Sequence, residues 1–257
     1  MVPRRPPLLG LAILVAAVLP VAACGAASAD ALVREGRALL AKGRPSEAAA
    51  KLEAALDDDP DCLPAEGCLA AAYHGLCDLE RAVDHYWAVQ RRSYPPLAPT
   101  APEPAVRERE LLVECEALVA VCANEERRKQ GLPLLVPDAP LAEIARQHSQ
   151  EMRDLSYFSH QSPTRGLATI RERLQSRLAS VADFTIAENI ARRWSQIRYS
   201  LAPAGIRSTH EEWMDSPGHR ANILNKRLAS IGVGIAVNSR GDYWATEFFA
   251  TYSMGAH

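Results

Sequence analysis

The chain has 257 residues, of which 48% are hydrophobic and 23% are charged, and its formal net charge is −2. These values are ordinary for a globular protein with a sizeable core, and they leave room for one large domain or two modest ones. The near-balance of charge argues against nucleic acid as a partner, and short basic runs such as Arg91-Arg92 indicate solvated surface.

The first 29 residues have the pattern of an export signal. Arg4 and Arg5 are followed by an apolar segment, residues 8–19, that is too short to span a membrane comfortably. Val21-Ala22-Ala23-Cys24 then resembles a bacterial lipobox, in which Cys24 is acylated. A rival cleavage signal is Ala27-Ser28-Ala29. We predict that residues 1–29 form a signal peptide with a lipobox at Cys24. The protein would be exported and held at the cell envelope only by a lipid anchor, or secreted if cleavage follows Ala29.

Export gives the six cysteines access to an oxidising environment. Cys115 and Cys122 are seven residues apart on an expected helix, so their separation of about 10 Å is too large for a disulfide. If Cys24 is set aside, three others could pair with one another or across domains: Cys62, Cys68 and Cys77. The absence of a CxxC motif argues against a zinc finger.

Residues 30–96 are rich in Ala and Leu at helical spacing and repeat with a period of 34 residues. Three pairs of positions follow this period: Leu39 and Tyr73, Ala48 and Ala82, and Leu52 and Tyr86. The pattern resembles the tetratricopeptide repeat, a helix-turn-helix unit with small residues where its helices touch. Two repeats are too few for an independent solenoid, so we expect them to lean on the next domain or on a partner. They would act as a protein-interaction adaptor or form a helical hairpin without a ligand.

A proline-rich segment follows the repeats, with five prolines among residues 95–104. Such a composition favours an extended spacer, so we predict a linker over residues 97–108 and a second domain over residues 109–257. Helical periodicity and stop signals predict four helices in that domain, over residues 105–130, 137–153, 168–178 and 207–215. Two late apolar segments, 229–237 and 243–252, read as paired strands with a turn at 238–242. Helices flanking an antiparallel sheet define an α+β layer fold.

Three polar stretches in this domain predict one converging site. Phe158-Ser159-His160 occupies an expected loop, and Glu188-Asn189-Ile190 supplies a carboxylate. A helix carrying Trp213 is expected to stop at Pro217-Gly218, which puts His219 at a chain bend. His148 lies in a charged helical run and is expected to be exposed.

Five motifs follow one another along residues 109–253. They are Asn124-x-x-Arg127…Gly131-Leu132-Pro133, Phe158-Ser159-His160, Glu188-Asn189-Ile190, Trp213-Met214-Asp215-Ser216-Pro217-Gly218-His219-Arg220 and Gly232-Val233-Gly234. Together they resemble the CAP superfamily, also called SCP/TAPS, in its bacterial secreted branch. The resemblance implies an α-β-α sandwich with a cleft that holds two histidines and two acidic residues.

Carried over by position, the resemblance implies that His160 and His219 are the cleft histidines and that Glu188 is the first acid. Animal members carry Glu three residues after the tryptophan, where this chain has Ser216. Glu212 lies one turn earlier on the same helical face and could substitute.

Two imidazoles and a carboxylate are an acceptable set for a divalent metal, so His160, His219 and Glu188 could bind zinc. We expect an exported binding module whose cleft takes a divalent metal, a lipid or an envelope fragment, rather than an enzyme. A metal-assisted hydrolase acting on peptide or envelope polymer is one alternative, although the chain lacks H-E-x-x-H and a serine nucleophile elbow. Ser159 and Ser216 lie beside the histidines, so that a serine could pair with a histidine, and we count Ser216 and Glu212 among the residues of the cleft. Another alternative is an adaptor in which the repeats bind a protein partner.

Overall fold

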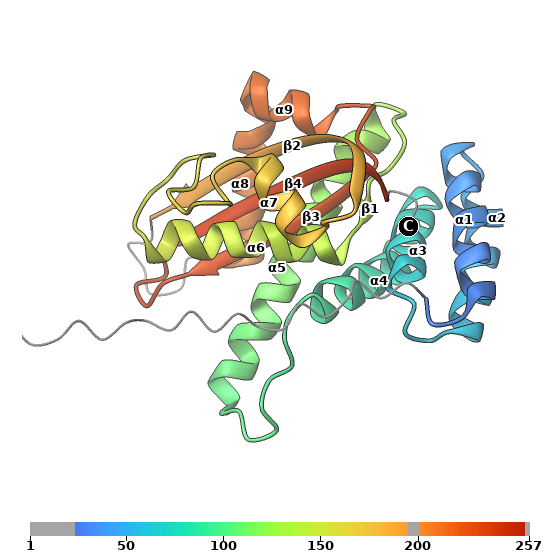
Figure 1. Cartoon of the computed structure of the whole chain (residues 1–257), viewed down its shortest axis with the longest axis horizontal. Coiled ribbons are helices and arrows are strands. Elements are labelled where there is room, and N and C mark those ends of the chain that lie inside the picture. The colour runs from blue at the N-terminus through green and yellow to red at the C-terminus, as the bar shows by residue number, and fades with distance from the viewer. Residues whose placement is uncertain (1–23, 195–200, 255–257) are drawn as a thin grey trace, which may run out of the picture.

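The computed structural model describes residues 24–194 and 201–254 (Figure 1). The predicted signal-peptide core, including Arg4, Arg5 and residues 8–19, lies outside this range. Within the part described, no helix combines the length and apolar character that a membrane crossing requires.

The N-terminal region consists of four helices: α1 (Ala27–Ala41), α2 (Pro45–Asp58), α3 (Leu63–Gly75) and α4 (Leu79–Arg92). Proline in the first turn starts α2 and α3, and the side chain of Asp78 caps α4 by accepting from the Arg81 amide. Gly36 on α1 lies directly against Leu52 on α2, which explains why a small residue stands where the two helices touch. The expected helical N-terminal region is confirmed.

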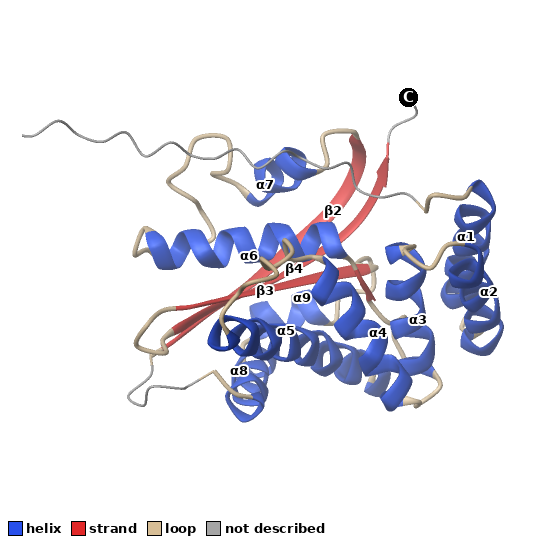
Figure 2. Cartoon of the chain, turned by 90° about the horizontal axis from the view of Figure 1, so that it is seen from below, coloured by secondary structure: helices blue, strands red, loops and turns tan. Residues whose placement is uncertain are grey.

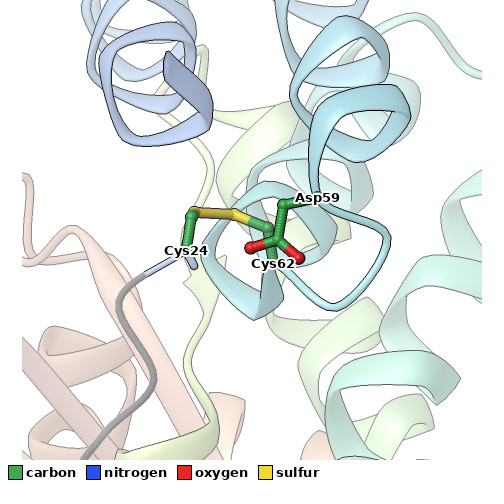
Figure 3. A group of neighbouring side chains, drawn as sticks. All are labelled: Cys24, Asp59 and Cys62. Carbon is green, nitrogen blue, oxygen red and sulfur yellow. A yellow bond between two sulfur atoms is a disulfide. The ribbon is translucent and has the colours of Figure 1, made fainter. Parts of the chain in front are cut away.

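A disulfide joins Cys24, just before α1, to Cys62 at the start of α3, with Cα atoms 4.6 Å apart (Figure 3). This bond differs from the prediction, in which Cys24 is set aside and only Cys62, Cys68 and Cys77 are considered for pairing. Asp59 lies beside the disulfide and accepts a hydrogen bond from the Gly25 amide at 2.5 Å. Cys115 and Cys122 are free and buried, in agreement with the prediction that they do not bond to each other.

The C-terminal domain is a three-layer α-β-α sandwich. Its sheet has the strand order β1-β3-β4-β2, with β1 parallel to β3 and the other pairs antiparallel. The strands are β1 (Val136–Pro137), β2 (Val181–Arg193), β3 (Ser230–Val237) and β4 (Tyr243–Met254). The helices are α5 (Glu103–Lys129), α6 (Ala139–Asp154), α7 (Ile170–Arg177), α8 (Pro203–Asp215) and α9 (Pro217–Ile223). Helices α6 and α7 cover one face, and α5, α8 and α9 cover the other (Figure 2).

Successive side chains of a strand point to opposite faces of the sheet, so each strand contributes residues to the packing of both helical layers. On β4, Phe248 packs with α6 and α7, whereas its neighbour Phe249 packs with the opposite layer. On β3, Gly232 and Gly234 face α6 so closely that a Cβ would lie 2.0 Å from its backbone. The Gly-x-Gly motif therefore allows a helix to contact a strand directly.

The N-terminal helices pack against the sandwich. The amide of Asn124 on α5 donates to the Tyr86 hydroxyl on α4 at 2.5 Å and to the Leu135 carbonyl at 2.8 Å. Arg146 on α6 donates to Glu116 on α5 at 2.7 Å and to the Ser93 carbonyl at 3.0 Å. These contacts agree with the expectation that residues 30–96 lean on the next domain.

Several predicted elements need correction. Helix α5 begins at Glu103, inside the expected linker, because Pro104 is tolerated in a first helical turn. Pro217 and Gly218 begin α9 instead of forming a bend, and His219 is therefore helical. Strand β2 was not predicted. His148 was expected to be exposed, but it is 1% exposed because its face of α6 packs toward the loop that carries His160.

Candidate functional site

The candidate site is built around Glu188, near the middle of the edge strand β2. Its side chain faces α6 and α7 and is 3% exposed. One carboxylate oxygen accepts from His160 Nδ1 at 2.9 Å, and the other accepts from Arg173 Nη2 on α7 at 2.6 Å. Arg173 also donates to the His160 carbonyl at 3.1 Å, so α7 holds both the carboxylate and the loop with the histidine. We call His160, Glu188, Arg173 and His219 the histidine site.

Burial opposes ionisation of Glu188, but the hydrogen bond from His160 and the positive charge of Arg173 outweigh it, and the pKa of Glu188 is lowered. Glu188 is therefore a carboxylate at neutral pH. Because a carboxylate only accepts hydrogen bonds, the Nδ1 of His160 carries the donated proton. In the neutral ring, the other nitrogen, Nε2, is then the atom with the free lone pair. The His160 side chain is 55% exposed.

His219 is positioned by two asparagines. The amide of Asn189 donates to the His219 carbonyl at 3.2 Å, and the amide of Asn222 donates to the Glu188 carbonyl at 3.2 Å and to Asn189 Oδ1 at 2.9 Å. Glu188 and Asn189 point to opposite faces of β2, so this pair ties both helical layers to one strand. Asn189 and Asn222 thus satisfy backbone carbonyl groups around the site.

The His219 side chain is half-buried and close enough to His160 for their charges to interact. Burial, and secondarily the neighbouring His160, lower the pKa of His219. The two imidazoles are therefore neighbours that come from different elements, His219 from α9 and His160 from the loop after α6.

Two polar side chains of α6, His148 and Glu151, contact the loop that carries His160. His148 Nε2 lies 3.1 Å from the Ser159 carbonyl, and burial lowers the pKa of His148. Glu151, one turn further along α6, accepts from the hydroxyls of Tyr157 at 2.7 Å and Ser162 at 2.8 Å. These contacts fix the loop that presents His160, which is a positioning role.

Three other candidates from the sequence make their contacts outside the histidine site. Glu212 is exposed and pairs with Arg193 at 2.7 Å. Ser216 lies between α8 and α9, where its backbone ends one helix and begins the next. Ser159 Oγ accepts from the Gln161 amide at 3.0 Å. Among the described residues, neither serine has a hydrogen bond to His160 or His219.

The histidine site does not bring three potential metal ligands together. In residues 24–194 and 201–254, three ligand atoms come within 4.8 Å of one another only for Cys24, Asp59 and Cys62, where the two sulfurs are already bonded to each other (Figure 3). Glu188 is occupied by Arg173 and His160. Its arrangement is that of an outer carboxylate that orients a histidine, rather than of a third metal ligand.

A second buried acid lies on the opposite face of the sheet. Glu247 on β4 is fully buried; Oε2 accepts from Asn189 at 2.9 Å, and Oε1 has no hydrogen-bond partner among the described residues. Burial raises its pKa to about 8, so the carboxyl is mostly protonated at neutral pH. The Asn189 amide that donates to the His219 carbonyl also donates to Glu247, so a neutral carboxyl group lies next to the histidine site.

Sequence reasoning missed Arg173, the cation that acts with the hydrogen bond from His160 to lower the pKa of Glu188. Nothing in the local sequence marks it, because it stands fifteen residues from Glu188 on an ordinary polar helix. The capping box of Thr169 and Glu172, which starts α7 and sets its register, was the available signal.

The fold and the histidine site together define a class of α-β-α proteins with two histidines at the edge of the sheet. The family model described as the cysteine-rich secretory protein family, CAP, matches residues 122–252, and the chain belongs to this family.

The chain is 38% identical over 137 residues to the protein YkwD of Bacillus subtilis, covering 52% of this chain and 46% of YkwD. It is also 38% identical over 113 residues to the membrane protein YlbC of Bacillus subtilis, covering 44% of this chain and 29% of YlbC. The chain thus spans less than half the length of these two relatives.

Among solved structures, the chain is similar to an extracellular SCP-domain protein of Bacillus anthracis. The two share 29% identity and a TM-score of 0.46, over 63% of this chain and 45% of that one. An outer surface protein of Borrelia burgdorferi shares 16% identity and a TM-score of 0.46, over 55% of this chain and 94% of that one.

Proposed function

We propose that this chain is an exported CAP-domain binding module in which the exposed Nε2 of His160, together with His219, contacts the ligand. The observation that carries the proposal is the Glu188–His160 hydrogen bond, because it fixes the ring and its tautomer while Nε2 stays accessible. His160 and Arg173 together keep Glu188 charged. Burying a charged carboxylate costs desolvation energy, which a loop with only a structural role does not require.

A divalent metal, zinc first, is the ligand that two neutral imidazoles favour. His160 and His219 would hold the metal, Glu188 would orient His160, and the remaining coordination positions would be left to water or substrate atoms. The fit is partial, because the set supplies two imidazoles and no free third protein ligand. A lipid or an envelope fragment would contact the same two histidines.

The test is zinc titration of the chain from Cys24 onward, by calorimetry and by metal content after dialysis. The wild type is compared with His160→Ala/His219→Ala and with His85→Ala, a histidine on α4 paired with Glu66. We expect about one zinc per chain in the wild type and in the His85 variant, and none in the double variant with its helical content unchanged. No saturable zinc binding by the wild type would remove the metal from the proposal, and isolated envelope material would then be the probe.

One observation supports a hydrolase as the second candidate. A buried carboxylate hydrogen-bonded to an imidazole whose other nitrogen is open is also the arrangement of a general base. Its substrate would be a peptide or an envelope polymer. Turnover of such a polymer by the wild type, lost in His160→Ala and unaffected in His85→Ala, would favour this candidate over binding alone.

We further propose that the protein acts at the cell envelope, in agreement with relatives described as extracellular and as a membrane protein. Lipidation of Cys24 would occupy its sulfur as a thioether and therefore exclude the disulfide with Cys62. Cleavage after Ala29 would remove Cys24 and the first residues of α1. Mass spectrometry of the exported protein distinguishes the three forms. Capture of a protein partner by α1–α4 is the remaining alternative.

A further inference from the structure

Strand β2 forms one edge of the sheet, so one side of its backbone has no neighbouring strand (Figure 1). From Asp183 to Arg193 it pairs with β4 in an unbroken antiparallel register. In such a ladder, the N–H and C=O groups of a residue point together, either to the partner strand or away from it, and this direction alternates along the strand. Every second residue of β2 therefore presents its backbone groups at the outer edge.

Two side-chain contacts identify the residues that face outward. The Glu188 carbonyl accepts from the Asn222 amide at 3.2 Å, and the Ile190 carbonyl accepts from the Trp213 indole at 3.2 Å. Asn222 and Trp213 lie on α9 and α8, so both carbonyls point away from β4. Residues of even number between 184 and 192 consequently face outward, and those of odd number pair with β4.

The outward backbone groups of Phe184 and Ile186 are open. In the part of the chain that the structure describes, no side chain and no other segment bonds to their N–H and C=O groups. Residues 184–187 are half-buried, and the two residues before them are exposed. Edge strands are commonly protected by lysine, proline or a β-bulge, and residues 184–187 have none of these. We call residues 184–187 the open edge of β2.

Two cations flank the open edge. Arg171 on α7 stacks on the Phe184 ring at 4.5 Å, and Arg227, after α9, donates to the Thr185 hydroxyl at 3.5 Å. Because Phe184 and Thr185 point to opposite faces of the sheet, one guanidinium group lies on each side of the strand. Both arginines are exposed, and among the described residues neither has a carboxylate within 4 Å. An exposed acid, Asp183, precedes this stretch next to the β-bulge.

The open edge leads to the histidine site. Glu188 is the next outward-facing residue after Ile186, about 7 Å further along the strand. Its side chain accepts from His160, and its carbonyl accepts from α9, the helix that carries His219. A chain that lies along the open edge would therefore continue directly to the two histidines.

We propose that the open edge of β2 binds an extended, acidic peptide segment of another molecule, which adds a strand to the sheet and reaches the histidines. The peptide backbone pairs with Phe184 and Ile186, and its carboxylates lie near Arg171 and Arg227. A second copy of this chain fits less well, because it would bring its own α7 and α9 and two like charges to the same short edge. The inference rests on the proposed function, since it names the class of ligand that reaches the histidine site.

The probe is an octapeptide of alternating glutamate and valine, blocked at both ends and labelled with fluorescein. Its binding to the chain from Cys24 onward is followed by anisotropy at low ionic strength. The protection of backbone amides in the complex is followed by hydrogen exchange and NMR. A peptide of alternating lysine and valine tests the charge. The acidic peptide with every backbone amide N-methylated keeps the charges but donates no hydrogen bond.

Two pairs of variants test the two contacts. Ile186→Pro removes an outward N–H, which an edge strand tolerates, and Ile186→Ala removes the same side chain but keeps that N–H. Arg171→Glu/Arg227→Glu reverses the flanking charges. Arg34→Glu/Arg91→Glu makes the same change of charge at exposed positions on α1 and α4.

We expect saturable binding of the acidic peptide, with exchange at the Phe184 and Ile186 amides slowed by at least about tenfold. The Thr185 and Ala187 amides, already bonded to β4, should change little. Affinity should be about fivefold or more lower in Ile186→Pro than in Ile186→Ala. It should be about tenfold or more lower in the Arg171/Arg227 variant, for the basic peptide and for the N-methylated peptide, and unchanged in the Arg34/Arg91 variant.

Three results would overturn the proposal: no saturable binding of the acidic peptide, equal binding of the acidic and basic peptides, or unchanged exchange at Phe184 and Ile186. A dimer of the free chain in sedimentation, with these amides already protected, would assign the edge to a second copy and also overturn it. Zinc binding without peptide binding would leave the proposed function standing, whereas peptide binding without zinc would remove only the metal. Circular dichroism and melting of each variant establish that it is folded.

Discussion

The substitution Arg173→Met tests whether the charge of Glu188 depends on one cation. Arg173 Nη2 lies 2.6 Å from Glu188 Oε2, and both side chains are 3% exposed. Methionine keeps most of the volume of the arginine stem but leaves the carboxylate buried without a cation. Removing one partner of a buried pair costs about 3–5 kcal/mol. Since small domains unfold with a free energy of about 5–15 kcal/mol, this loss should be large at pH 7.

The loss should also depend on pH. In the wild type, the pKa of Glu188 is lowered on folding, so its contribution is present above its unfolded pKa of about 4.3 and is lost as pH falls through the folded value. Without Arg173, the hydrogen bond from His160 still opposes the effect of burial, but the charge of Arg173 no longer does. We therefore expect the folded pKa of Glu188 to be higher in the variant than in the wild type, so that the variant tolerates a neutral Glu188 at a higher pH. The difference in unfolding free energy between wild type and variant should therefore shrink as pH falls from 7 toward 4.5.

Urea unfolding at pH 7 and pH 5, followed by fluorescence and circular dichroism, measures the loss of unfolding free energy in the variant and the dependence of that loss on pH. The matched control is Arg171→Met, two residues earlier on α7, where an exposed guanidinium stacks on Phe184 at 4.5 Å. We expect the control to change stability by less than about 0.5 kcal/mol. The reasoning is refuted if Arg173→Met unfolds like the control at pH 7, or if the loss is larger at pH 5.

Two further predictions concern buried groups outside the histidine site. Folding raises the pKa of Glu247 to about 8, so the folded chain keeps a proton that the unfolded chain releases near about pH 4.3. The unfolding free energy should then fall as pH rises through this window, and Glu247→Gln should flatten that decline; a wild-type profile no steeper than that of the variant contradicts this. The disulfide between Cys24 and Cys62 spans 38 residues and should contribute about 4 kcal/mol through the unfolded chain. The melting temperature of the unlipidated wild type should fall on reduction, whereas Cys62→Ser should melt low with or without a dithiol and Cys77→Ser, at an exposed free thiol, should behave like wild type.

The sequence predicted those elements whose pattern is local. Helices α5 and α6 have long amphipathic stripes, and β3 and β4 are rich in apolar and aromatic residues on both sides of a clear turn signal. Strand β2 was missed because it lies at the sheet edge, with a mixed polar sequence that gives no clean alternation. Helix α9 was missed because Pro217 was read as a stop, although proline is equally suited to a first helical turn.

Some features of the candidate site could be predicted from local sequence, and others depend on how the elements pack. His160, Glu188 and His219 were recognisable because each lies in a short motif with apolar neighbours. What could not be predicted is how the carboxylate is used, because the contact with Arg173 depends on how α7 packs against β2. His148 shows the same limit, since a charged helical run does not reveal which of its side chains faces a loop.

The packing of α4 on α5 and α6 has a mechanical consequence. Tyr86 is tied to Asn124, and Arg146 reaches back to the Ser93 carbonyl, so the helices before the proline-rich segment do not swing freely on it. If a lipid anchor or a partner protein holds the start of α1, it would also fix the distance and orientation of His160 and His219 relative to the membrane or to that partner. The N-terminal helices would thus form a rigid connection between the attachment point and the sheet. A force applied at Cys24 would be transmitted to the sheet and not taken up by a flexible linker.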